Sequence, residues 1–355
     1  MASIGIMTAG AWGTAVGTVL ARQEHAVQLY DIRQDVVEEI NQKHINSRFL
    51  PEVVLPDTIR ATLDLKEVCT DKDFLFLVVP SLYLLDVVKK IRMVPDVLEG
   101  KPHIAVMTKG FIDIGKGPRL LLDILEEYLP GFYRDSLAYI SGPSHAEEVG
   151  QGKVTGLIVA SKNGKNAVRF RNLLSGPVFI PFSSFDVIGV QTCAAAKNVI
   201  AIAFGILDAL TEKSGRFGDN TESLLLAAGL NEIQALGRSL GAQYPETFTS
   251  IAGVGDLDVT CRSKYGRNRR FGREIVQNTI LDGYSGLDDL LVRIENVGYL
   301  PEGVVACKHV HTLARRYSLH LPISNGIYRV LNKEVDPQDE VTHMIESMTR
   351  FTTVG

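Results

Sequence analysis

The sequence places one lysine where proton chemistry is possible. Lys197 lies in the apolar stretch Val187–Leu210 and is its only charged residue before Asp208. The stretch is too long for one strand, and its Ala, Ile and Leu content predicts a buried helix. Burial strips water from an ammonium group, disfavours its charged form and lowers its pKa toward the working range of an acid/base group. On position alone, the lysine could equally reach the surface or pair with a carboxylate.

The same stretch is long enough to cross a membrane. Gln191, Lys197, Asn198 and Asp208 interrupt it, however, and nothing beside it is typical of a membrane anchor. We therefore expect a central helix packed on all sides by protein, with no membrane insertion.

A second polar cluster follows the predicted loop Gly253–Leu257, which contains Asp256. The basic run Gly266–Arg270 is compatible with a nucleic-acid patch, a solvated face or a phosphate site. No aromatic side chains interleave it and the net charge of the chain is −4, so nucleic acid is not expected as a partner. Arg267 offers a planar fork for phosphate oxygens, and Asn268 adds a donor near a helix start.

The amino-terminal residues match a dinucleotide-binding pattern. The predicted order is strand Ser3–Met7, turn Thr8–Ala15, helix to about Gln23, and strand His25–Asp31 ending in an acid. Gly10 and Gly13 let the backbone approach a pyrophosphate at the helix N-terminus, and Asp31 would accept hydrogen bonds from the adenosine ribose. The alternative is a glycine-bearing loop that only packs a helix on a sheet.

The cofactor choice rests on three residues. Thr8 stands where the first glycine of the pattern belongs, and a β-branched residue disfavours the positive φ of that turn. Asp31 favours NAD because a carboxylate repels a 2′-phosphate, whereas Arg33 could hold that phosphate. We expect NAD or NADP, with a modest preference for NAD.

Strands and helices continue to alternate through the first half. Predicted strands are Asp73–Val79, His103–Thr108, Leu137–Ile140, Gly156–Ala160 and Val178–Pro181; predicted helices are Gln34–Lys43, Lys66–Thr70, Leu84–Ile91 and Leu120–Tyr128, with an irregular connection at Ser47–Pro51. Ligands of open α/β sheets bind beyond the carboxyl ends of the strands. Thr8–Gly13, Pro80-Ser81, Lys109 and Gly142–Ala146 all follow predicted strands, which indicates one binding edge.

The second half is expected to be helical. After the central helix, helices are predicted at Asn220–Leu240, Leu287–Arg293, Val304–Tyr317, Ser324–Leu331 and Asp336–Arg350. The predicted fold class is α/β, with a Rossmann-like doubly wound sheet over residues 1–186 and an all-helical domain over residues 187–355.

Bulk properties fit this division. A chain of 355 residues suits two domains, and its 45% hydrophobic content is that of a globular protein with full cores. The four cysteines are far apart and no signal-peptide pattern begins the chain, so we expect reduced thiols and a cytoplasmic protein. His309 and His311 point to different sides of a predicted helix without a third ligand, so no metal is expected.

Taken in order, these runs resemble the NAD(P)-dependent glycerol-3-phosphate dehydrogenases, especially the bacterial biosynthetic type. The matching runs are AWGTA at 11–15, PS at 80–81, TKG at 108–110, SGPSHAEEVG at 141–150, IGVQ with AAAKNVIAIA within 188–203, FGDN at 217–220, GVGDL with TC within 253–261, RNRRFG at 267–272 and EG at 302–303. Such enzymes interconvert dihydroxyacetone phosphate and sn-glycerol 3-phosphate and supply the glycerol backbone of phospholipids. We also expect a homodimer.

The resemblance implies a role for each matching position. Lys197 would be the general acid/base, with Lys109 and Asp256 helping to hold the substrate and tune that lysine. The remaining substrate contacts would be Gly142, Ser144, Thr260, Arg267 and Asn268. The cofactor contacts would be Gly10, Ala11, Trp12, Gly13, Asp31, Arg33, Lys109, Ala146, Arg267 and Glu302.

The sequence departs from the family pattern at three places. Thr8 replaces a glycine, Gly266 replaces a common serine, and Ala227-Ala228 replace a common Thr-Arg pair. These changes bear on ligand affinity more than on reaction class. Two alternatives remain: a dehydrogenase of the same architecture for another small hydroxy acid, disfavoured by Arg267-Asn268, and a non-catalytic nucleotide sensor, disfavoured by Lys109, Lys197 and Asp256 together.

Overall fold

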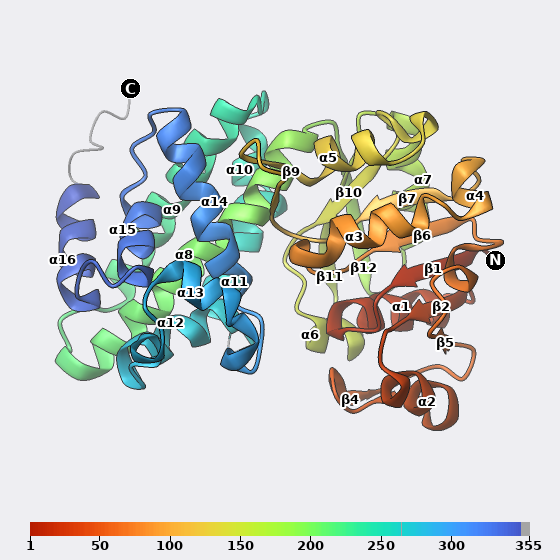
Figure 1. Cartoon of the computed structure of the whole chain (residues 1–355), viewed down its shortest axis with the longest axis horizontal. Helices are drawn as coiled ribbons and strands as arrows, with labels where there is room; N and C mark the ends of the chain where they lie inside the picture. The colour runs from red at the N-terminus through yellow and green to blue at the C-terminus, as the bar shows by residue number, and fades with distance from the viewer. Residues whose placement is uncertain (264, 349–355) are drawn as a thin grey trace. The chain divides into compact units, whose positions relative to one another are not determined.

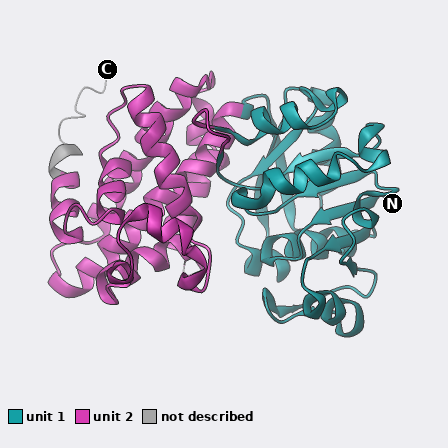
Figure 2. Ribbon diagram, viewed as in Figure 1, with its two compact units in different colours: residues 1–112, 119–187 teal, residues 113–118, 188–355 magenta. Residues whose placement is uncertain are grey.

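The computed structural model describes residues 1–263 and 265–348. The chain divides into two compact units (Figure 2), one of residues 1–112 and 119–187 and one of residues 113–118 and 188–355. The first unit holds the main sheet and the second is helical, which confirms the predicted fold class.

An eight-stranded sheet forms the centre of the first unit (Figure 1), in the order β12-β11-β10-β7-β6-β1-β2-β5. All neighbouring strands run parallel except β10 and β11. The strands are β1 (Ser3–Met7), β2 (Ala26–Tyr30), β5 (Arg60–Thr62), β6 (Phe74–Leu77), β7 (His103–Val106), β10 (Ala138–Ser141), β11 (Thr155–Ala160) and β12 (Phe179–Ser184). The strand order reverses beside β1, which is where ligands of doubly wound sheets bind.

Helices and short turns connect these strands. They are α1 (Ala11–Arg22), α2 (Gln34–Lys43), η1 (Glu67–Cys69), α3 (Ser81–Ile91), α4 (Pro95–Leu98), α5 (Leu121–Tyr128), η2 (Gly131–Tyr133), α6 (Ala146–Gly150) and α7 (Gly164–Leu174). Phe170 of α7 packs edge to face on Phe76 of β6, with ring centroids 5.6 Å apart. Burial on both faces explains why the central strands are continuous apolar runs without alternation.

Several elements of the structure differ from the sequence prediction, and the edge strand β5 and the short helix α4 are among those that it lacks. Residues 47–51, predicted as an irregular connection, belong to a hairpin of β3 (Ile45–Asn46) and β4 (Leu50–Val54), whose Leu50 and Val53 are buried. A second short pair joins β8 (Phe111–Asp113) and β9 (Pro118–Leu120). Helix α7 was also not predicted, although Asn163 caps it by accepting hydrogen bonds from the backbone N–H groups of Lys165 and Asn166.

The second unit is built around the central helix α8 (Val187–Ser214). Around it lie α9 (Asp219–Leu240), α10 (Glu246–Thr249), η3 (Ile251–Gly255), α11 (Asp256–Arg262), α12 (Arg267–Gln277), η4 (Ile280–Gly283), α13 (Leu287–Val292), η5 (Ile294–Val297), α14 (Glu302–Arg316), α15 (Pro322–Leu331) and α16 (Pro337–Met348). No strand occurs after Val187 in the described part of the chain. The predicted end of the last helix at Arg350 lies outside the described residues.

Helix α8 is long and apolar enough to cross a membrane, but its most apolar window is completely buried inside the protein. Its packing on all sides confirms the prediction of a central helix. The predicted loop at Gly253–Leu257 is wrong: a π-helical turn, η3, leads directly into α11. Gly253 makes this tight turn possible, because a Cβ there would lie 2.0 Å from the carbonyl oxygen of Phe248.

Candidate active site

Lys197 is the centre of a buried polar cluster in the helical unit. Its side chain is 6% exposed, and its ammonium donates hydrogen bonds to Asp256 Oδ1 and to Thr260 Oγ1, the latter at 2.7 Å. The Thr260 hydroxyl in turn donates to the backbone carbonyl of Asp256 at 2.6 Å, so its lone pairs face the lysine. Of the alternatives left open by the sequence, a surface-reaching lysine is therefore excluded.

The local fold explains why Asp256 and Thr260 reach the same lysine. They are four residues apart on α11 and so lie on one face of it. The π turn before α11 sets where that face points, and Ser250 fixes the start of the turn by accepting a hydrogen bond from Ala252 N–H at 3.1 Å. Asp256 is fully buried, so its carboxylate and the lysine ammonium stabilise one another's charge in a water-poor setting.

Helix α12 crosses α8 at a pair of glycines. A Cβ on Gly205 would lie 1.9 Å from the carbonyl oxygen of Arg269, and one on Gly272 would lie 2.1 Å from that of Ile202. Only glycine permits this close backbone contact between helices. The crossing holds the N-terminus of α12, with Arg267 and Asn268, beside the helix that carries Lys197.

Arg267 differs from the other arginines of α12. Arg269, Arg270 and Arg273 pair with Asp208, Glu274 and Glu212 at 2.5, 2.7 and 2.7 Å. Arg267 is exposed and has no ion pair with any described residue. An exposed guanidinium without a carboxylate partner at the start of a helix suits an anionic ligand.

Asn268 connects α12 to the start of α14. Its Oδ1 accepts a hydrogen bond from the backbone N–H of Gly303 at 2.8 Å, and the residue is buried. Gly303 also approaches α8 closely, because a Cβ there would lie 2.4 Å from the carbonyl oxygen of Asn198. The predicted residues Lys197, Asn268 and Glu302 are thus brought together from three helices.

In the α/β unit, the turn before α1 has the features of a dinucleotide cradle. No side chain caps the first turn of α1 and that turn contains no acidic residue, so its N–H groups and positive dipole end suit a phosphate. A Cβ on Gly13 would lie 2.1 Å from the carbonyl oxygen of Thr8, which explains the need for glycine there. Ala11 and Trp12 lie in this first turn, and Trp12 packs edge to face on Phe179.

Thr8 takes up a positive φ, which is unfavourable for a β-branched residue. Its φ is +98°, a value favoured by glycine, and its hydroxyl accepts a hydrogen bond from Gly10 N–H at 3.3 Å. The turn therefore keeps the glycine geometry with a threonine in place, at a cost in backbone strain.

Asp31 and Arg33 lie differently from what the pattern suggested. Asp31 is only 5% exposed, and its two carboxylate oxygens accept hydrogen bonds from Ala9 N–H at 3.2 Å and Arg33 N–H at 3.1 Å. Burial raises the pKa of Asp31, and these two bonds oppose the rise. Arg33 and Arg48 each lie 5.7 Å from the ring centre of Phe49, so two cations flank one aromatic ring near the end of β2. The sequence pattern gave no sign of Arg48 and Phe49 as neighbours of Arg33, because residues 47–51 were predicted to be an irregular connection.

The predicted strand-end residues also converge. Lys109, after β7, donates to the carbonyl oxygen of Gly142 at 3.4 Å, and the Ser144 hydroxyl donates to the same oxygen at 2.9 Å. Gly142 has a φ of +127°, which requires glycine. Ala146 begins α6 immediately beyond, and a Cβ on Gly110 would lie 2.9 Å from Ser81 Oγ. The loops after β6, β7 and β10 therefore meet at one edge, as predicted.

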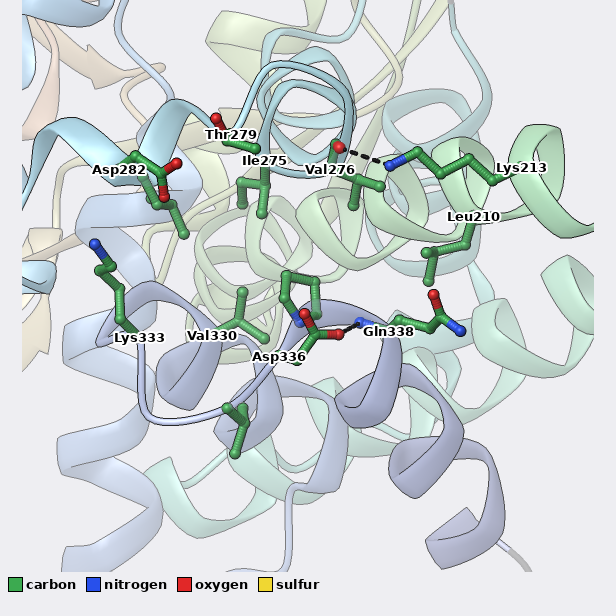
Figure 3. Close-up of a pocket in the computed structure, with 13 residues that line it drawn as sticks. Leu210, Lys213, Ile275, Val276, Thr279, Asp282, Val330, Lys333, Asp336 and Gln338 are labelled. Carbon is green, nitrogen blue, oxygen red and sulfur yellow. Dashed lines mark hydrogen bonds between the residues drawn. The ribbon is translucent and has the colours of Figure 1, made fainter.

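Other parts of the structure lie apart from these residues. A cavity of about 460 Å³ in the helical unit (Figure 3) is lined by none of the predicted site residues. Two polar side chains of its lining form hydrogen bonds with the backbone of the helical unit: Lys213 donates to the Val276 carbonyl, and Asp336 accepts from Gln338 N–H. Within residues 1–263 and 265–348, no group of three or more His, Cys, Asp or Glu side chains is arranged to hold a metal ion.

Comparison with known proteins adds independent observations. Residues 3–167 match the family model of the NAD-dependent glycerol-3-phosphate dehydrogenase N-terminus, and residues 186–342 match that of its C-terminus. Glycerol-3-phosphate dehydrogenase [NAD(P)+] of Treponema denticola is 53% identical over 353 residues, 98% of this chain and 99% of the relative. The Treponema pallidum protein of the same name is 53% identical over 343 residues, 94% of this chain and 96% of the relative.

A solved structure agrees with these sequence matches. The crystal structure of glycerol-3-phosphate dehydrogenase from Coxiella burnetii has a TM-score of 0.84 and 33% sequence identity, covering 97% of this chain and 99% of that one. With both family models matched in order over nearly its whole length, the chain belongs to the NAD-dependent glycerol-3-phosphate dehydrogenase family.

Proposed function

We propose that this chain is an NAD(P)-dependent glycerol-3-phosphate dehydrogenase that interconverts dihydroxyacetone phosphate and sn-glycerol 3-phosphate. The observation that carries the proposal is Lys197, buried in α8 and held by Asp256 and Thr260. Family membership supports the reaction class, and the nucleotide cradle before α1 supports the cofactor.

The chemistry needs one well-placed proton. When bound, the reduced nicotinamide supplies a hydride to the C2 carbonyl of dihydroxyacetone phosphate, and the carbonyl oxygen gains negative charge. Lys197 donates a hydrogen bond to that oxygen and then its proton, which yields the alcohol. In the reverse direction, the neutral amine accepts the proton from the C2 hydroxyl.

Asp256 and Thr260 keep the lysine ready for this task. Burial alone disfavours the ammonium form, whereas the adjacent carboxylate favours it, so the pair keeps a proton on Lys197 in a water-poor site. Thr260 has committed its own proton to the Asp256 carbonyl, so it presents a lone pair to the ammonium and orients it.

Other predicted residues would bind the ligands. The substrate phosphate would bind Arg267, whose guanidinium has no carboxylate partner among the described residues, with Asn268 beside it. Lys109, Gly142 and Ser144 would complete the substrate site. The cofactor would bind Gly10, Ala11, Trp12, Gly13, Arg33, Ala146 and Glu302. Asp31 would support the turn before α1 by accepting the hydrogen bond from Ala9 N–H.

The direct test is the oxidation of NADPH or NADH by the purified chain with dihydroxyacetone phosphate. No turnover with either nucleotide would overturn the proposal. Unphosphorylated dihydroxyacetone and small 2-oxo acids test the alternative of another hydroxy-acid substrate, and we expect turnover at least about a hundredfold slower without the phosphate, since the arginine contact is lost.

The role of Lys197 is tested by Lys197→Met, which keeps an apolar side chain of similar length and removes the ammonium group that donates the proton. We expect kcat to fall by about 10²–10⁴-fold with nucleotide affinity unchanged. This variant leaves the Asp256 carboxylate buried without its cation, which is destabilising. The matched control is therefore Lys197→Met with Asp256→Asn, which should be equally inactive but more stable. Turnover near that of the wild type in either variant would refute the role.

We further propose that the enzyme acts in the cytoplasm as a homodimer and supplies glycerol phosphate for phospholipid synthesis. The resemblance to the biosynthetic dehydrogenases supports the pathway. Light scattering on the purified chain tests the dimer, and a mass equal to that of one chain would contradict it.

A further inference from the structure

The loop that carries Lys109 is held by two buried side-chain hydrogen bonds. Strand β7 ends at Val106, so the backbone groups of Thr108 lie beyond the sheet ladder and need other partners. The hydroxyl of Tyr139, on β10, donates to the Thr108 carbonyl at 2.9 Å. The hydroxyl of Thr108 donates to the Val79 carbonyl at 2.6 Å. The ends of three adjacent strands, β6, β7 and β10, are thereby tied together.

These bonds lie in a dry environment. Tyr139 is completely buried and Thr108 is 4% exposed. A phenylalanine would fill the position of Tyr139 with the same ring, so the hydroxyl is needed for its hydrogen bond and not for packing. Without it, the Thr108 carbonyl would lose this partner and remain buried without that hydrogen bond, which is unfavourable.

The bond from Tyr139 fixes the orientation of the next residue. The Thr108 carbonyl and the Lys109 N–H belong to one planar peptide, so holding the oxygen also sets the direction in which Lys109 leaves the loop. Gly110 follows with a φ of +141°, and a Cβ there would lie 2.9 Å from Oγ of Ser81, the first residue of α3. Lys109 therefore reaches Gly142 from a backbone that is fixed on both sides.

We infer that Tyr139 and Thr108 are positioning residues that act through Lys109, beyond the roles assigned to the matching family positions. The inference rests on the proposed function in one respect, namely that Lys109 contacts the substrate. Removing either hydroxyl lets the 108–109 peptide rotate and moves the Lys109 ammonium away from its working position. A displacement of about 1 Å at such a group can cost about a hundredfold in rate.

The test compares single-atom changes. In Tyr139→Phe we expect kcat/KM for dihydroxyacetone phosphate to fall about tenfold or more. The matched control is Tyr133→Phe, because Tyr133 is also buried but its hydroxyl has no hydrogen-bond partner among the described residues. This control should retain wild-type kinetics. Thr108→Val should behave like Tyr139→Phe, whereas Thr108→Ser, which keeps the hydroxyl, should not.

A double-variant cycle separates positioning from general damage. If Tyr139 acts through Lys109, adding Tyr139→Phe to Lys109→Met should change kcat/KM by less than about twofold, because the positioned group is already gone. A full additional loss in the double variant, or Tyr139→Phe kinetics within twofold of the wild type, would overturn the inference. Should Tyr139→Phe fail to fold, the Thr108→Val and Thr108→Ser pair gives the same comparison.

A second readout does not depend on turnover. The rate of reductive methylation of Lys109, followed by peptide mass spectrometry, should change in Tyr139→Phe and stay unchanged in Tyr133→Phe. Equal Lys109 rates in wild type and Tyr139→Phe would contradict the inference even if the chain had no dehydrogenase activity. Absent wild-type turnover with a changed labelling rate would instead overturn only the proposed function.

Discussion

Replacement of Thr8 by glycine should improve both the stability and the cofactor affinity of this protein. Thr8 has a φ of +98°, while the other described non-glycine residues with positive φ lie between 48° and 66°. Those values are close to the left-handed helical region, which non-glycine residues tolerate better. Thr8 is β-branched and lies outside that region, so it carries the clearest backbone strain in the described chain.

The magnitude follows from three contributions. Relief of the strained φ is worth about 1–3 kcal/mol. Glycine makes the unfolded chain more flexible, which costs about 0.4–1 kcal/mol. The hydrogen bond from Gly10 N–H to the Thr8 hydroxyl is lost, but at 3.3 Å it is long and contributes about 0.5 kcal/mol. The expected net gain in the free energy of unfolding is about 1 kcal/mol.

Cofactor binding should tighten for a related reason. In the wild type, Gly10 N–H donates a hydrogen bond to the Thr8 hydroxyl within the turn before α1. Glycine at position 8 releases this donor toward the pyrophosphate, and one charge-assisted hydrogen bond lowers the Kd by about three- to tenfold.

The assays are urea unfolding for stability and nucleotide fluorescence titration for Kd. Thr8→Ala is the matched control, because alanine loses the hydroxyl yet keeps a Cβ at positive φ. It should gain no stability. A Thr8→Gly protein no more stable than the wild type, or no more stable than Thr8→Ala, would show that the turn is not strained. Unchanged or weaker Kd would show that the turn has adapted to threonine.

Three further perturbations test other parts of the structure. Gly205→Ala would put a Cβ 1.9 Å from the Arg269 carbonyl oxygen. We therefore expect the free energy of unfolding in urea to fall by about 1–3 kcal/mol and the KM for dihydroxyacetone phosphate to rise. An unchanged KM would contradict the role of the helix crossing. Burial raises the pKa of Glu232 to about 7 from 4.5, while hydrogen bonds from Ser324 and Ile323 oppose the rise. Because the folded state binds this proton more tightly, the free energy of unfolding should fall as pH rises from about 4.5 to 7. Glu232→Gln should remove this pH dependence in unfolding curves. An equal pH dependence in the variant and the wild type would refute the assignment. Arg33→Ala should raise KM for NADPH more than for NADH, because only NADPH carries the 2′-phosphate that the Arg33 guanidinium would bind. An equal effect on both nucleotides would contradict this assignment.

The architecture and the candidate chemistry could be predicted from local sequence patterns alone. Alternating strands and helices predicted the doubly wound sheet, because burial on both faces leaves a local pattern of apolar runs separated by turns. A long, mostly apolar stretch predicted the central helix, whereas the position of Lys197 within it left open whether its ammonium is buried or reaches the surface. The same local rules brought the loops after β6, β7 and β10 to one edge, since parallel strands end on the same side.

Which polar groups contact one another, by contrast, could be learned only from the folded chain. Lys197 and Asp256 are 59 positions apart, and their contact depends on the π turn before α11, where the sequence predicted a loop. The close approach of α12 to α8 depends on Gly205 lying against the backbone of Arg269. The spacing of hydrophobic residues along the sequence does not indicate such a backbone contact. Likewise, the Asp31 carboxylate accepts a hydrogen bond from the backbone N–H of Ala9, which lies 22 positions earlier in the chain and becomes its neighbour only in the folded protein. Hydrophobic spacing sets which face of an element is buried, whereas the partner of each polar group is set by how those faces pack.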